Sequence, residues 1–192
     1  MSDAIGLDEY MAVRDPANAA NFGSLGDDYR YSGRWDQAIA AYRTALSLSP
    51  KYKFAHLNIC SALLGKNDPA GALREAEAEP NEISRTEGQA LAWHALGRKA
   101  DADAALATLI GQYERKVPYA IAAVLAYRGE ADRAFEWLGK AVDNQDTGLA
   151  SVFHEPLFTR LHGDPRWLGF LRKLGKAPEQ LAAVPIKVAI PK

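Results

Sequence analysis

Residues 22–50 read FGSLGDDYRYSGRWDQAIAAYRTALSLSP, and this stretch decides the fold of the chain. Gly33, near its middle, can take the left-handed backbone conformation that ends a helix at little steric cost. The small residues Gly26 and Ala38 let two helices approach closely, where larger side chains would hold them apart. Pro50 ends the second helix because proline has no N–H to donate. The stretch therefore predicts two antiparallel helices that reverse near Gly33.

The same stretch resembles a complete tetratricopeptide repeat (TPR), which has characteristic residues at fixed offsets. These are a large apolar residue, Leu-Gly, Tyr, Ala, an aromatic residue, Ala and Pro. The chain fills them with Phe22, Leu25, Gly26, Tyr29, Ala38, Tyr42, Ala45 and Pro50. The resemblance implies one helix over residues 19–31 and a second over residues 35–48.

The repeat pattern continues through three further units, at about 53–82, 83–114 and 115–143. A Gly or Asn precedes an Ala by five residues four times, as Gly33 and Ala38, Asn67 and Ala72, Gly97 and Ala102, and Gly129 and Ala134. With the first unit, at about 19–52, this predicts a TPR array over residues 19–143. We expect an all-α solenoid of antiparallel helix pairs, and the resemblance implies a right-handed superhelix.

Three local signals refine the array. Asp68 and Pro69 read as the N-cap and first residue of a helix. Pro80 and Asn81 should end that helix early. Residues 119–127 are apolar on all sides, which predicts a helix buried between its neighbours.

The two ends depart from the repeat pattern. Residues 1–18 are either an N-terminal cap helix or half of an earlier repeat, and both interpretations stay open. Residues 144–175 predict capping helices near 156–161 and 165–174, because apolar side chains there can cover the last repeat. We assign no role to the tail over 176–192.

Composition indicates a folded protein without an obvious charged partner. The 192 residues are 48% hydrophobic and 24% charged, with a net charge of -1. This balance points to neither nucleic acid nor an anionic membrane as partner. We find no signal-peptide pattern and no uncharged stretch near the ~20 residues that span a bilayer. A cytoplasmic location is therefore predicted, and the single cysteine, Cys60, agrees with a reducing compartment.

Little in the sequence points to catalysis, a metal or a cofactor. The four histidines share no short metal-ligand spacing, and Cys60 occupies a small-residue packing position of the repeat. No phosphate-binding glycine loop is present. We predict no catalytic, metal-binding or cofactor-binding residues; the four histidines are His56, His94, His154 and His162.

Binding of a protein or peptide has more support, from the geometry that the TPR resemblance implies. Stacked repeats form a concave groove lined by the first helix of each unit. For Leu57, Leu64 and Tyr127, packing inside the array is an equally good interpretation. The groove positions of the family fall here on Asp27, Arg30, Tyr31, Phe54, Leu57, Leu64, Glu87, Leu91, His94, Tyr119 and Tyr127.

One TPR subclass can be tested directly. TPR domains that hold the acidic tail of chaperones grip a terminal carboxylate with Lys, Asn and Arg at set positions. Here four of those positions hold Gly23, Asp27, Ser61 and Glu87. A cochaperone role is therefore disfavoured.

Residues 90–175 carry a second resemblance, most specific at Asp164-Pro165-Arg166-Trp167 with Phe170-Leu171. They are similar to C-terminal repeat regions of bacterial signalling proteins, including class III adenylate cyclases and winged-helix transcription regulators. The resemblance implies a regulatory module beside an output domain that lies outside this chain.

Three classes of function follow. The first is a non-catalytic interaction module that binds a peptide or partner protein in the concave groove. The second is the C-terminal regulatory region of a larger bacterial signalling protein. An enzyme, the third class, has the least support. Homo-oligomerisation is a further prediction, because a solenoid that begins with half a unit exposes apolar surface at its N-terminal face.

Overall fold

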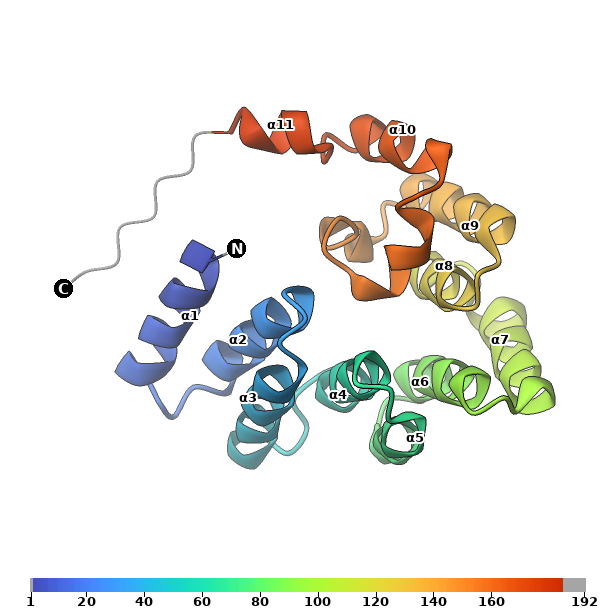
Figure 1. Cartoon of the computed structure of the whole chain (residues 1–192). Coiled ribbons are helices and arrows are strands. Elements are labelled where there is room, and N and C mark those ends of the chain that lie inside the picture. The colour runs from blue at the N-terminus through green and yellow to red at the C-terminus, as the bar shows by residue number, and fades with distance from the viewer. Residues whose placement is uncertain (1, 185–192) are drawn as a thin grey trace. The chain divides into compact units, whose positions relative to one another are not determined.

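The computed structural model describes residues 2–184, with side chains from Ala4 onward, and this part of the chain is all-α (Figure 1). It divides into two compact units, one reaching Thr108 and the other beginning at Leu109, which are described separately. The elements are α1 (Ser2–Arg14), α2 (Ala19–Tyr31), α3 (Trp35–Leu48), α4 (Ala55–Gly65), α5 (Pro69–Ala78), α6 (Glu82–Ala95), α7 (Lys99–Tyr113), α8 (Pro118–Tyr127), α9 (Ala131–Asp143), the 3-10 helices η1 (Thr147–Ala150) and η2 (Pro156–Leu161), α10 (Pro165–Lys173) and α11 (Pro178–Ala182).

Four short turns between consecutive helices use one left-handed residue each. Gly33 has a φ of 73°, Gly97 of 72° and Gly129 of 80°, and Asn67 takes the same conformation with a φ of 61°. These are the four residues that precede an alanine by five in the sequence, so the predicted turns are confirmed. The first pair, α2 and α3, has the predicted bounds.

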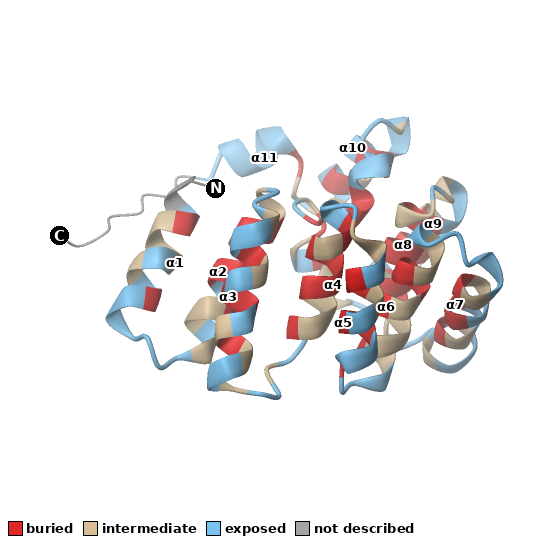
Figure 2. Ribbon diagram, turned by 60° about the horizontal axis from the view of Figure 1, so that its bottom comes forward, coloured by how far each residue is buried: buried red, intermediate tan, exposed pale blue. Residues whose placement is uncertain are grey.

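The first unit stacks its helices in chain order. Consecutive helices from α1 to α6 contact each other, and α4 also contacts α2 and α6. The first helices of successive pairs therefore form a row. Figure 2 shows that these helices carry both buried and exposed residues, whereas the turns between them are mostly exposed.

A tight contact between α2 and α3 explains why Gly26 lacks a side chain. A Cβ atom at Gly26 would lie 2.6 Å from Cε1 of Tyr42, which is only 1% exposed. Such a contact is too close for a real Cβ, so the ring of Tyr42 occupies the space that a side chain at Gly26 would need. Ala38 is fully buried in the same core.

The sequence signals around α5 are also confirmed. The Asp68 side chain accepts a hydrogen bond of 2.8 Å from the Gly71 N–H, and Pro69 begins the helix. The helix ends at Ala78, two residues before Pro80. This helix is shorter than α3, as the proline predicts.

In the second unit, α8 is enclosed by its neighbours. Every residue from Pro118 to Ala126 except Tyr119 is buried, and α8 packs against α9, η1 and η2. The short helix predicted near 156–161 is present as a 3-10 helix rather than an α-helix. Its Phe158 is fully buried and meets the ring of Trp167 at 5.8 Å.

The two chain ends are helical where the structure describes them. Residues 2–14 form α1, which packs on α2 through a 2.6 Å hydrogen bond from the Tyr29 hydroxyl to Oε1 of Glu9. A cap helix and half a repeat both stay predictions for this segment. Residues 178–182 form α11, and residues 185–192 of the predicted tail lie outside the described residues. Among the helices described, none combines the length and apolar character that crossing a membrane requires.

Candidate functional site

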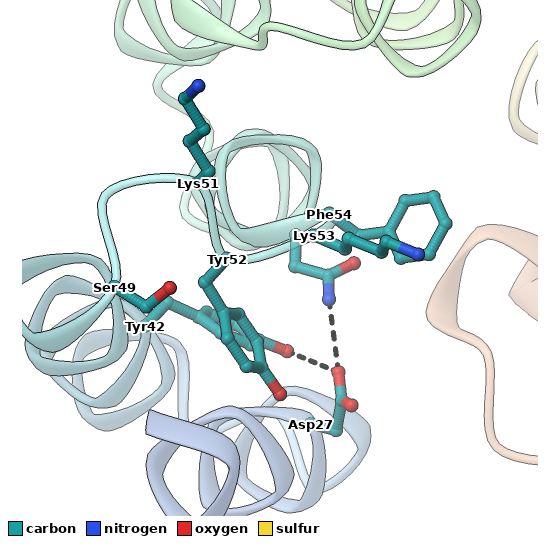
Figure 3. A pocket seen from close by; sticks show the side chains of 8 residues that line it. Asp27, Tyr42, Ser49, Lys51, Tyr52, Lys53 and Phe54 are labelled. Atoms are coloured by element: carbon teal, nitrogen blue, oxygen red, sulfur yellow. Dashed lines mark hydrogen bonds between the residues drawn. The ribbon is translucent and has the colours of Figure 1, made fainter. Parts of the chain in front are cut away.

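A pocket of about 410 Å³ opens in the first unit between α2, α4 and the loop that joins α3 to α4 (Figure 3). We call it the α2–α4 pocket. It brings together two of the predicted groove residues, Asp27 and Phe54. Its lining residues are Asp27, Tyr42, Ser49, Lys51, Tyr52, Lys53, Phe54 and Asn58.

The carboxylate of Asp27 is held in place by two donors from different helices. Oδ1 accepts a hydrogen bond of 2.6 Å from the Tyr42 hydroxyl and one of 3.1 Å from Nδ2 of Asn58. The hydroxyls of Tyr42 and Tyr52 both point toward this carboxylate (Figure 3). The network links α2, α3 and α4, so it gives the pocket a defined polar wall.

Burial and the Asp27 carboxylate alter both tyrosines. Burial raises the pKa of Tyr42 far above its usual value, and the neighbouring Asp27 carboxylate raises it further. Burial also raises the pKa of Tyr52, again with a contribution from Asp27. Gly23 makes room for Tyr52, because a Cβ there would lie 2.0 Å from the tyrosine oxygen.

The raised pKa of Tyr42 predicts a loss of stability at alkaline pH. The unfolded phenol ionises near pH 10, whereas the folded phenol keeps its proton to higher pH. Below pH 10 the Tyr42 phenol is protonated in both the folded and the unfolded chain. Above pH 10, ionisation of this phenol in the unfolded chain lowers the free energy of unfolding by up to about 1.4 kcal/mol for each pH unit. Urea unfolding of Tyr42→Phe between pH 9 and 11.5 should therefore show a shallower decline than the natural chain. Equal slopes would contradict the prediction.

Phe54 is the unusual residue of the pocket. It has a φ of 63°, the left-handed conformation that residues other than glycine rarely adopt, and it precedes the first residue of α4. The residue is 53% exposed. The backbone conformation costs roughly 1–2 kcal/mol, and the exposed ring gains little from burial in the free protein.

Two lysines of the joining loop add positive charge to the pocket. Lys51 and Lys53 are both exposed, and neither forms an ion pair among the residues that the structure describes. In Figure 3 the side chain of Lys51 extends away from Asp27. The pocket thus combines an exposed aromatic ring, a fixed carboxylate and a cationic rim.

The other predicted groove residues of the first unit differ in burial. Leu91 is fully buried and Leu64 is 8% exposed, so both contribute to packing rather than to an accessible surface. Leu57 is half-buried, with Cδ1 3.5 Å from the position of a Cβ on Gly88 of α6. This contact supports the packing interpretation for Leu57 and Leu64.

The charged and aromatic residues among the predicted groove positions of the first unit are largely covered by their neighbours. Arg30 is 4% exposed, and its guanidinium carbon lies 4.6 Å from the ring centre of Tyr31. Tyr31, Glu87 and His94 are half-buried. A partner protein can contact these four residues only through those of their atoms that are exposed to solvent.

Tyr119 and Tyr127 belong to the second unit. The Tyr119 ring meets Phe158 edge to face at 5.3 Å, and its backbone N–H donates to Oδ2 of Asp146 at 3.1 Å. The guanidinium carbon of Arg160 lies 5.9 Å from the ring centre of Tyr127. Tyr119 therefore packs against the capping segment.

Most of the pocket lies outside the positions that the repeat pattern marks. Ser49, Lys51, Tyr52 and Lys53 belong to a loop, and Asn58 occupies a helical position to which the pattern gives no role. The alternation of lysine and aromatic side chains in Lys51-Tyr52-Lys53-Phe54 was a usable signal for an exposed, charged loop.

Cys60 is buried in the first unit, as its packing position indicated. It is fully buried, with Sγ 3.8 Å from the carbonyl oxygen of Gly88. Burial raises the pKa of this thiol strongly, and the carboxylates of Glu87 and Glu75 raise it further. The thiolate is therefore disfavoured in the folded protein.

This burial predicts an unreactive thiol. A thiol reagent at pH 8 should leave the native chain unmodified on the timescale that modifies a free cysteine, and should label one cysteine per chain after unfolding in urea. Colorimetric thiol titration checks both states. Rapid labelling of the native chain would show that Cys60 is accessible.

The remaining polar cluster of the first unit joins three helices. Glu75 of α5 pairs with Arg43 of α3, and its other oxygen lies 2.9 Å from Nδ1 of His56 of α4. Glu75 is 9% exposed, so these contacts offset the cost of burying its charge. Within residues 2–184, no three His, Cys, Asp or Glu side chains gather as metal ligands would.

Helix pairs that stack in chain order through left-handed turns define an all-α solenoid of the helical-repeat class. Residues 26–66, which include the C-terminal part of α2, the whole of α3 and α4 and the pocket residues, match a family model described as TPR repeat. This stretch of the chain therefore carries a TPR repeat. The chain has no match among curated proteins. TPR repeats generally mediate protein–protein interaction and form a non-catalytic module.

Proposed function

We propose that this chain is a protein-interaction module that binds an extended or helical segment of a partner protein along the row of α2, α4 and α6. The α2–α4 pocket is the anchor of this surface. The module has no catalytic role and works in the bacterial cytoplasm. The general role of TPR repeats supports an interaction function, and the pocket suggests where contact begins.

Phe54 is the observation that carries the proposal. In the free protein this residue combines a left-handed backbone with an exposed fraction of 53%, and both are unfavourable for a phenylalanine. Backbone outliers of this kind are often found at binding sites, where the conformation aims a side chain at a ligand. A partner that covers the ring gains the apolar burial that the free chain lacks.

The pocket also indicates the chemistry of the bound segment. An apolar or aromatic side chain can pack against Phe54, and acidic residues beside it can approach Lys51 and Lys53. Asp27 is already an acceptor for Tyr42 and Asn58, so its position is fixed before binding. The expected partner segment is thus apolar with flanking negative charge.

A photocrosslinking amino acid tests the proposal at single-residue resolution. Benzoyl-phenylalanine at position 54 keeps the aromatic ring and should crosslink a partner in a lysate of the source cells, identified by mass spectrometry of the joined peptide. The same residue at position 13 is the matched control, because Val13 is 80% exposed on α1 and outside the pocket. Equal crosslinking from both positions would overturn the proposal.

The second class of function, a regulatory region of a larger signalling protein, is still a prediction. It differs from the first in acting within one polypeptide. Reading the coding frame upstream of Met1 separates them, because an adjoining cyclase or DNA-binding domain would establish the second class. Self-association at the N-terminal face and a ligand role for Tyr119 and Tyr127 are likewise predictions.

A further inference from the structure

A second hollow lies in the other unit, between α9 and α10, with a volume of about 540 Å³. We call it the α9–α10 groove. It shares no residue with the α2–α4 pocket. It is lined by Phe135, Gly139, Val142, Asp143, Arg166, Gly169, Phe170 and Lys173.

Two glycines keep this groove open. Gly139 of α9 and Gly169 of α10 are both exposed, and no atom lies within 4 Å of a Cβ built on either. Packing within the chain therefore does not require glycine here, unlike at Gly26. Glycine inside a helix is unfavourable relative to alanine, so these positions are better explained by something that approaches the two helices closely.

One end of the groove is braced by Arg166. Its Nη1 lies 2.8 Å from Oδ1 of Asp132 on α9, and its Nη2 lies 2.7 Å from Oδ2 of Asp164, the N-cap of α10. Its guanidinium carbon also lies 4.4 Å from the ring centre of Phe135. These contacts join the N-terminal ends of α9 and α10, so the two helices line the groove in the same direction and its walls are preformed.

The other end carries two opposite charges. Asp143 ends α9 and Lys173 ends α10, both exposed. Neither forms an ion pair with any residue between 2 and 184. One rim of the groove is therefore acidic and the other basic at this end, with the apolar side chains of Phe135, Val142 and Phe170 along its length.

We propose that the α9–α10 groove binds a second copy of this chain about a two-fold axis that runs along the groove. This axis places α9 of each copy on α10 of the other, so that Asp143 of each copy meets Lys173 of the other. A partner segment of one charge sign would be attracted by one rim and repelled by the other, whereas a second copy complements both. The glycines let the backbones approach, and the phenyl rings of both copies fill the hollow.

Filling the groove tests the interface without damaging the fold. Sedimentation equilibrium of the full chain should show a concentration-dependent dimer. Gly139→Leu and Gly169→Leu meet no atom nearby and should each weaken the dimer by about tenfold or more, with an unchanged circular dichroism spectrum. Gly111→Leu is the matched control, because Gly111 is an exposed helical glycine with equally open surroundings on α7, and it should leave the dimer unchanged.

Charge reversal then tests the two-fold arrangement. Asp143→Lys and Lys173→Asp should each weaken the dimer, and the double variant should restore it, because only a second copy carries both reversals. If the natural chain stays monomeric at the highest concentration measured, the proposal is overturned, and the groove would instead bind a different protein. A dimer insensitive to both glycine variants would place self-association elsewhere, such as the N-terminal face. Failure of the double variant to recover would exclude this two-fold axis.

Discussion

Replacing Phe54 with glycine is expected to abolish partner capture while raising the stability of the first unit. Glycine adopts a φ of 63° without steric penalty, so the variant removes roughly 1–2 kcal/mol of backbone strain. The greater freedom of glycine in the unfolded chain offsets about 0.5–1 kcal/mol of this gain. A net increase of up to about 1.5 kcal/mol in the free energy of unfolding should therefore accompany loss of the ring. Urea unfolding and the partner-capture assay measure the two effects.

Two matched variants separate the ring from the backbone. Phe54→Ala removes the ring but keeps the strain, so it should lose capture without becoming more stable. Asn67→Gly changes a residue with a φ of 61° at the turn between α4 and α5, outside the pocket. It should leave capture intact. Undiminished capture by Phe54→Gly would remove the main support for the pocket as a binding site.

Replacing Phe158 with alanine is expected to destabilise the second unit strongly. The side chain is fully buried, meets Tyr119 edge to face at 5.3 Å and lies 5.8 Å from Trp167. Truncating a buried phenylalanine costs roughly 3–5 kcal/mol, because it removes apolar burial and leaves a cavity. The loss should appear as faster amide hydrogen exchange in α8, where η2 packs.

Phe153→Ala is the control for this variant. Phe153 is only half-buried, and its ring contact is with His154, its neighbour in the chain. A much smaller change in exchange is expected. If the two variants lose equal stability, the capping segment does not depend on the Phe158 cluster.

The parts of the fold set by local chemistry could be predicted from the sequence. Gly33, Gly97 and Gly129 take left-handed conformations that other residues avoid. Asp68 with Pro69 marks a helix start through hydrogen bonding and a missing donor. These causes act within a few residues, whereas the bounds of α2 and α3 were implied by the TPR resemblance and agree with the structure.

The pocket could not be predicted in the same way. Phe54 takes a conformation that its own side chain disfavours, so no local preference identifies it. Tyr42 reads as a packing residue, and it is one, yet its hydroxyl also holds Asp27 at 2.6 Å. Such a role depends on the meeting of three helices. The burial of Leu91, which the repeat pattern placed in the groove, likewise depends on how the helices pack. The packing of η2 against α8 likewise joins segments that are far apart in the sequence.

The position of α1 implies an order in which the folded chain opens. Helices in a solenoid are held by their immediate neighbours, and among the helices that the structure describes α1 makes its extensive contacts with α2. The support for α1 includes Ile5 and Ala12 in the core and the hydrogen bond from Tyr29 to Glu9. This helix should detach before the pairs behind it, and its departure would uncover the outer face of α2. Proteolysis after the exposed Arg14 would then mark the first step of unfolding while the α2–α4 pocket is still intact.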